Sequence, residues 1–379
     1  MRRRASQFGA TLLIGVLVLA VLNLLITPNR VWAQRPGVLE TTFNSAVGTA
    51  FGSIVDIERD GSGNIYVAYG STIKKISSAG ATTLTITTAD SVQAFAVDPA
   101  GNIIVATRVS SIYRYTAAGA LDSTFNTNSY AGSTATGNYL SNSVLSGIGV
   151  QTVTNGRIIV SSAGANSTQR LVGVQSLPTT TANAGKLDST FTQTSITSTM
   201  GTPAGLFLDS ANNIYVLGPA SMGYVKRLSP NGTFSAADTT FNSAITSNLS
   251  ATPKDITVDS SGNVYVVGDF TGRIKKFSSA GAPDAAYNTN TSTMPSGSLT
   301  TTLQSDGKLI VGGSFTGNLR RFNTDGTVDS TFTYNNATGG TVNKAVVLSD
   351  GFILAGTSSS PFLKKVYSVF LAPDAPGIP

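Results

Sequence analysis

The side chains of this sequence that could do chemistry are carboxylates, because the chain contains no histidine and no cysteine. These absences exclude disulfides, thiol catalysis, the usual serine and cysteine hydrolase triads, and most zinc sites. The only glutamates are Glu40 and Glu58. Asp56 lies two positions before Glu58, so both side chains share one face of an extended strand.

Asp56 and Asp255 open similar phrases, DIERDGSGN and DITVDSSGN. Pairs of carboxylates carry out glycoside hydrolysis, so Asp56, Glu58 and Asp255 are the candidate catalytic residues for an enzyme acting on carbohydrate. Asp269 also departs from the repeated pattern, because Ser314 occupies its place one unit later. The interpretation that we favour gives these acids a structural role, hydrogen bonding at strand ends, with no catalysis.

A second set of aspartates recurs in the motif DSTF and its variants: Asp122, Asp188, Asp238, Asp284 and Asp329. Calcium binds six or more oxygens, which turns rich in Asp and Asn can supply. Each motif, however, offers one Asp beside Ser or Thr, without a loop of alternating acids. We therefore expect turn capping, and we expect neither a bound metal nor a cofactor.

Basic residues also recur at one place in each unit: Lys75, Arg114, Arg170, Arg227, Lys276, Arg321 and Lys365. A positive ring of this kind could bind acidic glycans or lipid headgroups. Because a residue present in every unit usually belongs to the fold, we expect these side chains to cover strand surfaces and pair with the DSTF aspartates.

These residues are carried by a repeat of four short extended pieces, seen best in residues 255–287. Its Val-, Ile-, Tyr- and Phe-rich runs are four to six residues long and bounded by Gly, Asn, Asp or Ser, which predicts strands. The turn after the first piece recurs in seven units, marked by Gly63, Gly101, Gly156, Asn212, Gly262, Gly307 and Gly351. Four turns follow Asp-x-x-Gly-Asn, in which the Asp caps the turn, and three are Asn-Gly or Asp-Gly pairs.

Repeats of this kind predict an all-β, seven-bladed β-propeller of four-stranded antiparallel blades. The last unit lacks a DSTF motif, whereas Leu39 to Phe43, LETTF, precedes the first complete unit. We therefore expect LETTF to supply the outer strand of the seventh blade and to close the ring.

The phrase QSDGKLIVGGSFTGNLRRFNTDGTVDSTF, ending at Phe332, resembles the delta-60 repeat of bacterial secreted β-propellers, with some similarity to NHL-type repeats. The resemblance covers roughly residues 39–370 and departs most in the third unit, which carries Ser/Thr/Asn-rich insertions. It implies a propeller fold and an exported location. It implies no catalytic residues.

The N-terminus combines the basic residues Arg2 to Arg4, an apolar run and a small-residue cleavage site that ends at Ala33. This pattern predicts a signal peptide over residues 1–33. The alternative is an uncleaved membrane anchor. The propeller then occupies residues 34–371, and residues 372–379 form a Pro-rich tail or linker. Residues 1–33 hold four arginines and no acid, so removing them lowers the net charge from +6 to +2 and argues against nucleic acid as a partner.

These observations predict a secreted or cell-surface protein, with the periplasm as a further possibility, and no membrane span after signal removal. The function hypothesis is a non-catalytic binding module for an unknown protein or polysaccharide partner. The alternatives are a carboxylate-based carbohydrate-active enzyme that uses the central channel, or a structural spacer in a larger surface protein. The sequence leaves the ligand and the oligomeric state open.

Overall fold

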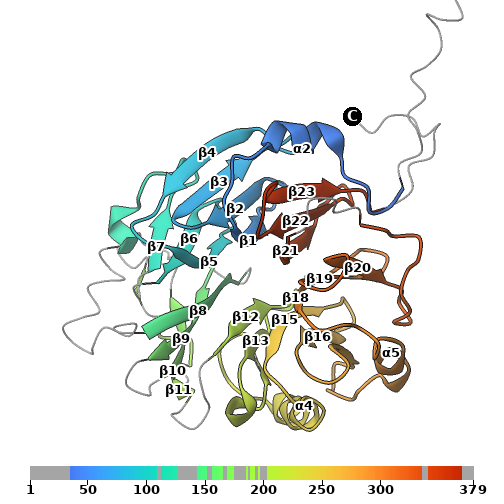
Figure 1. Cartoon of the computed structure of the whole chain (residues 1–379). Helices are drawn as coiled ribbons and strands as arrows, with labels where there is room; N and C mark the ends of the chain where they lie inside the picture. Colours follow the sequence, from blue (N-terminus) through green and yellow to red (C-terminus); the bar gives the residue numbers. More distant parts are fainter. Residues whose placement is uncertain are drawn as a thin grey trace, which may run out of the picture.

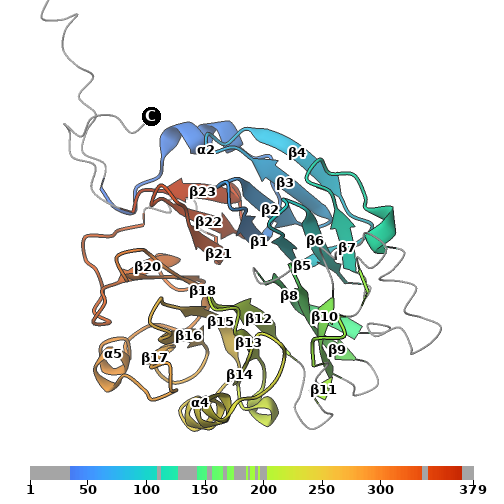
Figure 2. The same cartoon turned by 180° about the vertical axis from the view of Figure 1, so that it is seen from behind.

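The computed structural model describes residues 35–108, 112–126, 143–151, 156–164, 169–174, 185–186, 188–192, 195–196, 203–334 and 340–368. The predicted signal peptide, residues 1–33, and the predicted tail, residues 372–379, lie outside these residues. Within them, the chain forms seven small antiparallel sheets arranged around a central axis, so the fold is all-β and propeller-like (Figure 1). The same ring of sheets is seen from behind in Figure 2.

Each sheet begins with an inner strand beside the axis and continues outward through a middle strand and a third strand. The inner strands are β1 (Ile54–Arg59), β5 (Val92–Val97), β8 (Ser143–Val150), β12 (Gly205–Leu208), β15 (Pro253–Val258), β18 (Ser298–Leu303) and β21 (Val342–Val347). The middle strands are β2 (Ile65–Tyr69), β6 (Ile103–Thr107), β9 (Ile158–Gly164), β13 (Ile214–Leu217), β16 (Val264–Gly268), β19 (Leu309–Gly313) and β22 (Ile353–Thr357). The third strands are β3 (Thr72–Ile76), β7 (Ile112–Tyr115), β10 (Gln169–Val174), β14 (Val225–Leu228), β17 (Ile274–Phe277), β20 (Leu319–Phe322) and β23 (Leu363–Val366).

The core lies between neighbouring sheets, and the middle strands are its most buried part. In β6, β16 and β19 every residue is buried, as expected for strands packed on both faces. Apolar clusters join residues of one sheet to residues of the next, for example Ile256 and Phe277 with Tyr215 and Phe241. Each sheet therefore depends on its neighbours for burial.

The turn between inner and middle strands confirms the predicted capping by aspartate. The Asp60 carboxylate accepts hydrogen bonds from the backbone N–H groups of Ser62 and Asn64 and from the Asn64 side chain, the last at 2.7 Å. Gly63 follows in the left-handed region, with φ 79°, where glycine carries no steric penalty. Asp98, Asp209 and Asp259 repeat this arrangement.

The expectation of four strands in every unit is wrong for five sheets of the described chain, which have three. Among the residues that the structure describes, only the first and third sheets have a fourth strand, β4 (Thr82–Thr87) and β11 (Ser195–Ile196). In the second, fifth and sixth units the chain makes one bridge to the third strand, as Leu121 does to Tyr115, and then turns.

The physical reason lies in the DSTF motif, whose Asp initiates a helical turn. Asp122 accepts the Phe125 N–H at 3.0 Å, and Asp284 accepts the Tyr287 N–H at 3.1 Å, as helix N-caps do. Asp284 begins α5 (Ala285–Asn290). In the fourth unit Asp238 shares a capping box with Ser235 at the start of α4 (Ala236–Thr246), near the short 3-10 helix η2 (Ala220–Met222). The first unit lacks this Asp and forms the six-residue strand β4, whereas the third unit has Asp188 and adds only the two-residue strand β11 after it.

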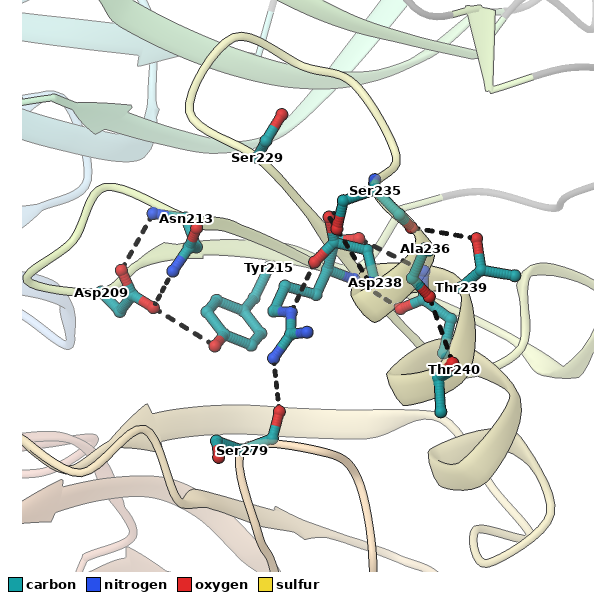
Figure 3. A network of polar contacts seen from close by, with 12 residues as sticks. Asp209, Asn213, Tyr215, Ser229, Ser235, Ala236, Asp238, Thr239, Thr240 and Ser279 are labelled. Atoms are coloured by element: carbon teal, nitrogen blue, oxygen red, sulfur yellow. Dashed lines mark hydrogen bonds and ion pairs between the residues drawn. The ribbon is translucent and has the colours of Figure 1, made fainter.

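The DSTF aspartate also pairs with the third-strand cation, as predicted. Arg114–Asp122, Arg227–Asp238, Lys276–Asp284 and Arg321–Asp329 approach to between 2.6 and 3.1 Å. The third unit uses Arg157 instead, paired with Asp188 at 2.5 Å, and the Arg170 side chain is outside the described part. Figure 3 shows the fourth unit, where the Arg227 guanidinium also donates to the Ser279 carbonyl of the next unit.

The N-terminal segment 37–47 lies against β23 (Figure 1). Leu39 bridges Val366, and the Glu40 N–H donates to the Lys365 carbonyl at 2.8 Å. LETTF is not a strand beyond this bridge, because the Glu40 carboxylate accepts the Phe43 N–H and begins helix α2 (Thr41–Val47). Glu40 thus caps the N-terminus of α2, as the DSTF-type aspartate Asp284 caps α5.

Candidate functional site

The charged residues near the axis follow an irregularity shared by the inner strands. The pairing register shifts just before Asp56 in β1, Asp255 in β15, Thr300 in β18 and Lys344 in β21. A β-bulge inserts an extra residue, bends the strand and re-aims the side chain that follows. The structure therefore brings these four polar residues from separate sheets to one level of the ring.

Lys344 and Asp56 form an ion pair between the last and first sheets. The Lys344 Nζ and Asp56 Oδ1 atoms are 3.1 Å apart, with side-chain exposures of 29% and 13%. Asp56 also accepts the Ile57 N–H at 2.9 Å. Asp56 raises the pKa of Lys344, so the lysine stays charged although burial opposes this. The Asn343 amide adds a hydrogen bond to the Ile54 carbonyl across the same seam.

Asp255 links the fifth sheet to the sixth. Its Oδ2 atom accepts hydrogen bonds from Thr300 Oγ1 at 3.0 Å and from the Thr301 N–H at 2.9 Å, while Oδ1 accepts the Ile256 N–H. Thr300 Oγ1 in turn accepts the Ala345 N–H of the seventh sheet at 3.3 Å. Burial raises the pKa of Asp255, although Lys344 and these donors act in the opposite direction.

Glu58 differs from the other two acids, because it makes no hydrogen bond or ion pair within the described part of the chain. It lies two residues after Asp56 on β1 and is partly exposed. Burial, and next the Asp56 charge, raise the pKa of Glu58 to about 8, although Lys344 and Arg59 partly offset them. Burial and the neighbouring Asp56 charge thus favour the protonated form of Glu58.

Glu58, Asp255 and Lys344 line a central cavity of about 570 Å³. We call the wall formed by β15, β18, β21 and β1 the polar arc, since it also contributes Arg59, Thr301 and Thr302. The wall formed by β5, β8 and β12 carries no charged side chain, and we call it the apolar arc. Its lining residues are Ala96, Val97, Ile148, Gly149, Val150, Leu206, Phe207 and Leu208. The cavity is thus amphipathic.

All three acids proposed from sequence meet at this cavity or immediately behind it. Asp269 does not, because it lies 3.9 Å from both Lys254 and Arg273 and its side chain is 51% exposed. Sequence reasoning missed Lys344, which aligns with Asp56 and Asp255 in the repeat. A charged residue at that aligned position was the signal that could have found it.

Comparison with family models supports β-propeller repeats over short stretches of the chain. A model described as "Domain of unknown function (DUF5122) beta-propeller" matches residues 304–332, and one described as "Beta-propeller repeat" matches residues 245–269. No curated protein matches the sequence.

Solved β-propellers resemble the whole fold at low sequence identity. A streptogramin B lyase structure has 14% identity and a TM-score of 0.55, covering 87% of this chain and 97% of that one. An inactive histidine-to-alanine variant of virginiamycin B lyase from Staphylococcus aureus, with quinupristin, has 12% identity and a TM-score of 0.58, covering 88% and 98%. The extracellular domain of a putative one component system from B. thetaiotaomicron has 13% identity and a TM-score of 0.57, covering 90% of this chain and 43% of that one. These similarities show a propeller-like fold. At this level of identity they do not indicate a function, which has to be argued from the site itself.

Within the residues that the structure describes, no helix is both long and apolar enough to cross a membrane.

Proposed function

We propose that this chain is an exported, non-catalytic binding module whose ligand site is the central cavity. The observation that carries the proposal is the cavity itself, which at about 570 Å³ has the size of small-molecule sites and combines an apolar wall with a few polar groups. Asp56 and Asp255 already hold neighbouring sheets together through Lys344, Thr300 and Thr301. Two of the three acids therefore serve the structure.

The ring is closed, in this proposal, by the N-terminal segment on the seventh blade. The Asn44 side chain donates to the Lys365 carbonyl at 2.9 Å and accepts its N–H at 2.8 Å. Asn288 forms the same two bonds with Lys276 in the fifth unit. This shared pair of hydrogen bonds supports the proposal that residues 39–44 complete the last blade as the DSTF motif completes other blades. The repeats belong, we propose, to the delta-60 type.

Export is proposed from the sequence of residues 1–33. Expression of the full chain in a secreting bacterium should release a protein whose N-terminal residue is Gln34, measured by intact mass. A retained mass that includes Met1, found in the membrane fraction, would establish the anchor instead.

The cavity proposal is tested by filling it. Thr302 lines the cavity from β18 and makes no side-chain hydrogen bond within the described chain, so Thr302→Trp should block it without removing a hydrogen bond. Thr85→Trp is the matched control, because Thr85 is exposed on β4 and makes no side-chain hydrogen bond within the described chain. A thermal-shift panel of sugars, anionic polysaccharides and amphipathic small molecules should give at least one shift that Thr302→Trp abolishes and Thr85→Trp retains. Equal shifts in both variants would place binding elsewhere.

Carbohydrate hydrolysis is the second candidate function, favoured by the pKa of Glu58 near 8, because a glycosidase needs a protonated carboxyl group at neutral pH. The histidine named in the lyase comparison has no counterpart, since this chain contains none. Turnover of polysaccharides and aryl glycosides should be abolished by Glu58→Gln. Turnover that survives Glu58→Gln combined with Asp56→Asn and Asp255→Asn would remove these residues from consideration.

A further inference from the structure

We infer that the central cavity selects ligands that carry an ammonium-type cation on an apolar body. This inference rests on the proposed function of the cavity as a binding site. It is drawn from the distribution of charged and apolar groups on the cavity wall, and it narrows the ligand to one chemical class.

The first argument is the balance of charge in the polar arc. Asp56, Glu58 and Asp255 face a single nearby ammonium group, that of Lys344, which lies 3.1 Å from Asp56. Arg59 is exposed at the rim and offsets Glu58 only in part. When all three acids are ionised, the cluster carries more negative than positive charge. A cationic group entering the cavity would compensate this excess, whereas an anionic group would increase it.

The second argument is the unpartnered carboxyl group of Glu58. Asp56 is compensated by Lys344, and Asp255 accepts three hydrogen bonds. The Glu58 side chain has neither kind of partner within the described chain, although it is only partly exposed and lines the cavity. A partly buried carboxylate without a partner is incompletely solvated, and a bound cation would stabilise its charged form. Glu58 is therefore the group that we expect to contact the ammonium head.

The third argument is the apolar arc, which faces the polar arc across the axis. Leu206, Phe207 and Leu208 from β12 and Ile148 and Val150 from β8 line this side. An alkyl or aromatic body of a ligand would bury apolar surface there at roughly 25 cal/mol per Å². A small inorganic cation would leave this surface hydrated, so the wall favours an organic cation.

The inference is tested with three probes whose alkyl chains have seven or eight carbons: n-octyltrimethylammonium, octanoate and 1-octanol. Isothermal titration calorimetry on residues 34–379 at pH 9 should show octyltrimethylammonium binding at least tenfold more tightly than octanol, with no binding of octanoate. The quaternary ammonium group does not titrate, so any pH dependence belongs to the protein.

Two variants connect the selectivity to the cavity charges. Between pH 6 and pH 9 the affinity for octyltrimethylammonium should rise about tenfold or more in the parent protein, because ionised Glu58 favours the cation, and Glu58→Gln should remove this rise. Arg59→Gln deletes a rim cation that makes no ion pair in the described chain, and it should strengthen binding severalfold. Asp56, Asp255 and Lys344 remain unchanged in both variants.

The outcomes separate the two proposals. Equal binding of octyltrimethylammonium and octanol, blocked by Thr302→Trp, would overturn the cation preference and leave the cavity as a binding site. Tighter binding of octanoate, or a pH rise that persists in Glu58→Gln, would also overturn it. Cation binding that survives Thr302→Trp would show that the cavity is not the site and would contradict both proposals.

Discussion

The polar and apolar arcs of the central ring both join neighbouring inner strands, but they do so through different contacts. In the polar arc, side chains bridge neighbouring inner strands through Asp255 with Thr300 and Lys344 with Asp56. In the apolar arc, Gly147 and Gly149 of β8 let Leu206 and Leu208 of β12 approach the strand backbone. The contacts between neighbouring sheets therefore differ around the ring although the fold is regular. As a result, the ring has a charged side and an apolar side.

The largest expected effect comes from crowding the apolar seam. A Cβ atom at Gly147 would lie 2.7 Å from both the Cβ and the backbone nitrogen of Leu206. Gly147→Val should therefore reduce the free energy of unfolding by about 3 kcal/mol, measured by chemical denaturation. In Gly205→Ala, the added atom would meet Leu217 Cδ1 at an ordinary 3.5 Å. If the two variants are equally stable, close glycine packing is not what holds this seam.

Breaking the ion pair should have the next largest effect. Lys344→Met leaves Asp56 uncompensated beside Glu58 and should cost about 2 kcal/mol of unfolding free energy, a value reduced for the partial exposure of the lysine. Lys254→Met is the control, because Lys254 is 3.9 Å from Asp269 and 45% exposed, and it should change stability by less than about 0.5 kcal/mol. A loss of unfolding free energy no larger than that of the control would show that the Lys344–Asp56 ion pair does not stabilise the fold.

A smaller effect is expected from removing one hydroxyl group. Thr300→Val loses the hydrogen bond to Asp255 and leaves the Ala345 N–H without its acceptor, which should cost about 1.5 kcal/mol. Thr302→Val has the same change of shape on the same strand with no hydrogen bond to lose, so it should be nearly neutral. Denaturation midpoints that coincide would show that Thr300 does not connect the sheets.

The smallest effect is a dependence of stability on pH. The pKa of Glu58 is raised to about 8 in the folded state, so between its ordinary value and 8 the folded protein binds more protons than the unfolded chain. Stability should therefore fall as pH rises through this window. Allowing for water in the cavity, we expect a loss of about 1 kcal/mol between pH 5 and pH 8.

Glu58→Gln should flatten this pH dependence, as monitored by thermal denaturation in a series of buffers. Acid unfolding below this range has the opposite origin. Burial alone would raise the pKa of Asp329, but hydrogen bonds from Lys308 and Thr331 lower it. Stability contributed by such aspartates is lost as pH falls. A slope above pH 5 that is unchanged in Glu58→Gln would assign the titration to another group.

The sequence predicted the seven repeated sheets well, because strand patterning and turn chemistry are local. Asp60 and its counterparts cap the turns as expected, since their partners are within four residues. The fourth strands were overpredicted, because the same residues that suit a strand also follow an N-capping Asp. In the second unit, for example, the Phe125 N–H donates to Asp122 and a helical turn begins there.

The candidate site was predicted in part, because Asp56, Glu58 and Asp255 break the repeat and can be found by alignment. The meeting of Lys344 with Asp56 depends on which sheets become neighbours across the ring. That relationship joins residues 288 positions apart in the sequence, so no local pattern encodes it. The effect of burial on Glu58 is likewise a property of the assembled cavity and not of the residue.

The contact between the N-terminal segment and β23 also determines the order in which the protein can be completed. Asn44 and Lys365 are separated by 321 positions, so this early segment meets its partner only after β23, the last strand of the described chain, has been made. Closing so long a loop is slow compared with forming a local hairpin. Until then, the apolar side chains of Phe43 and Val47 have only part of their final packing. Residues 37–47 therefore complete their packing only when β23 is in place.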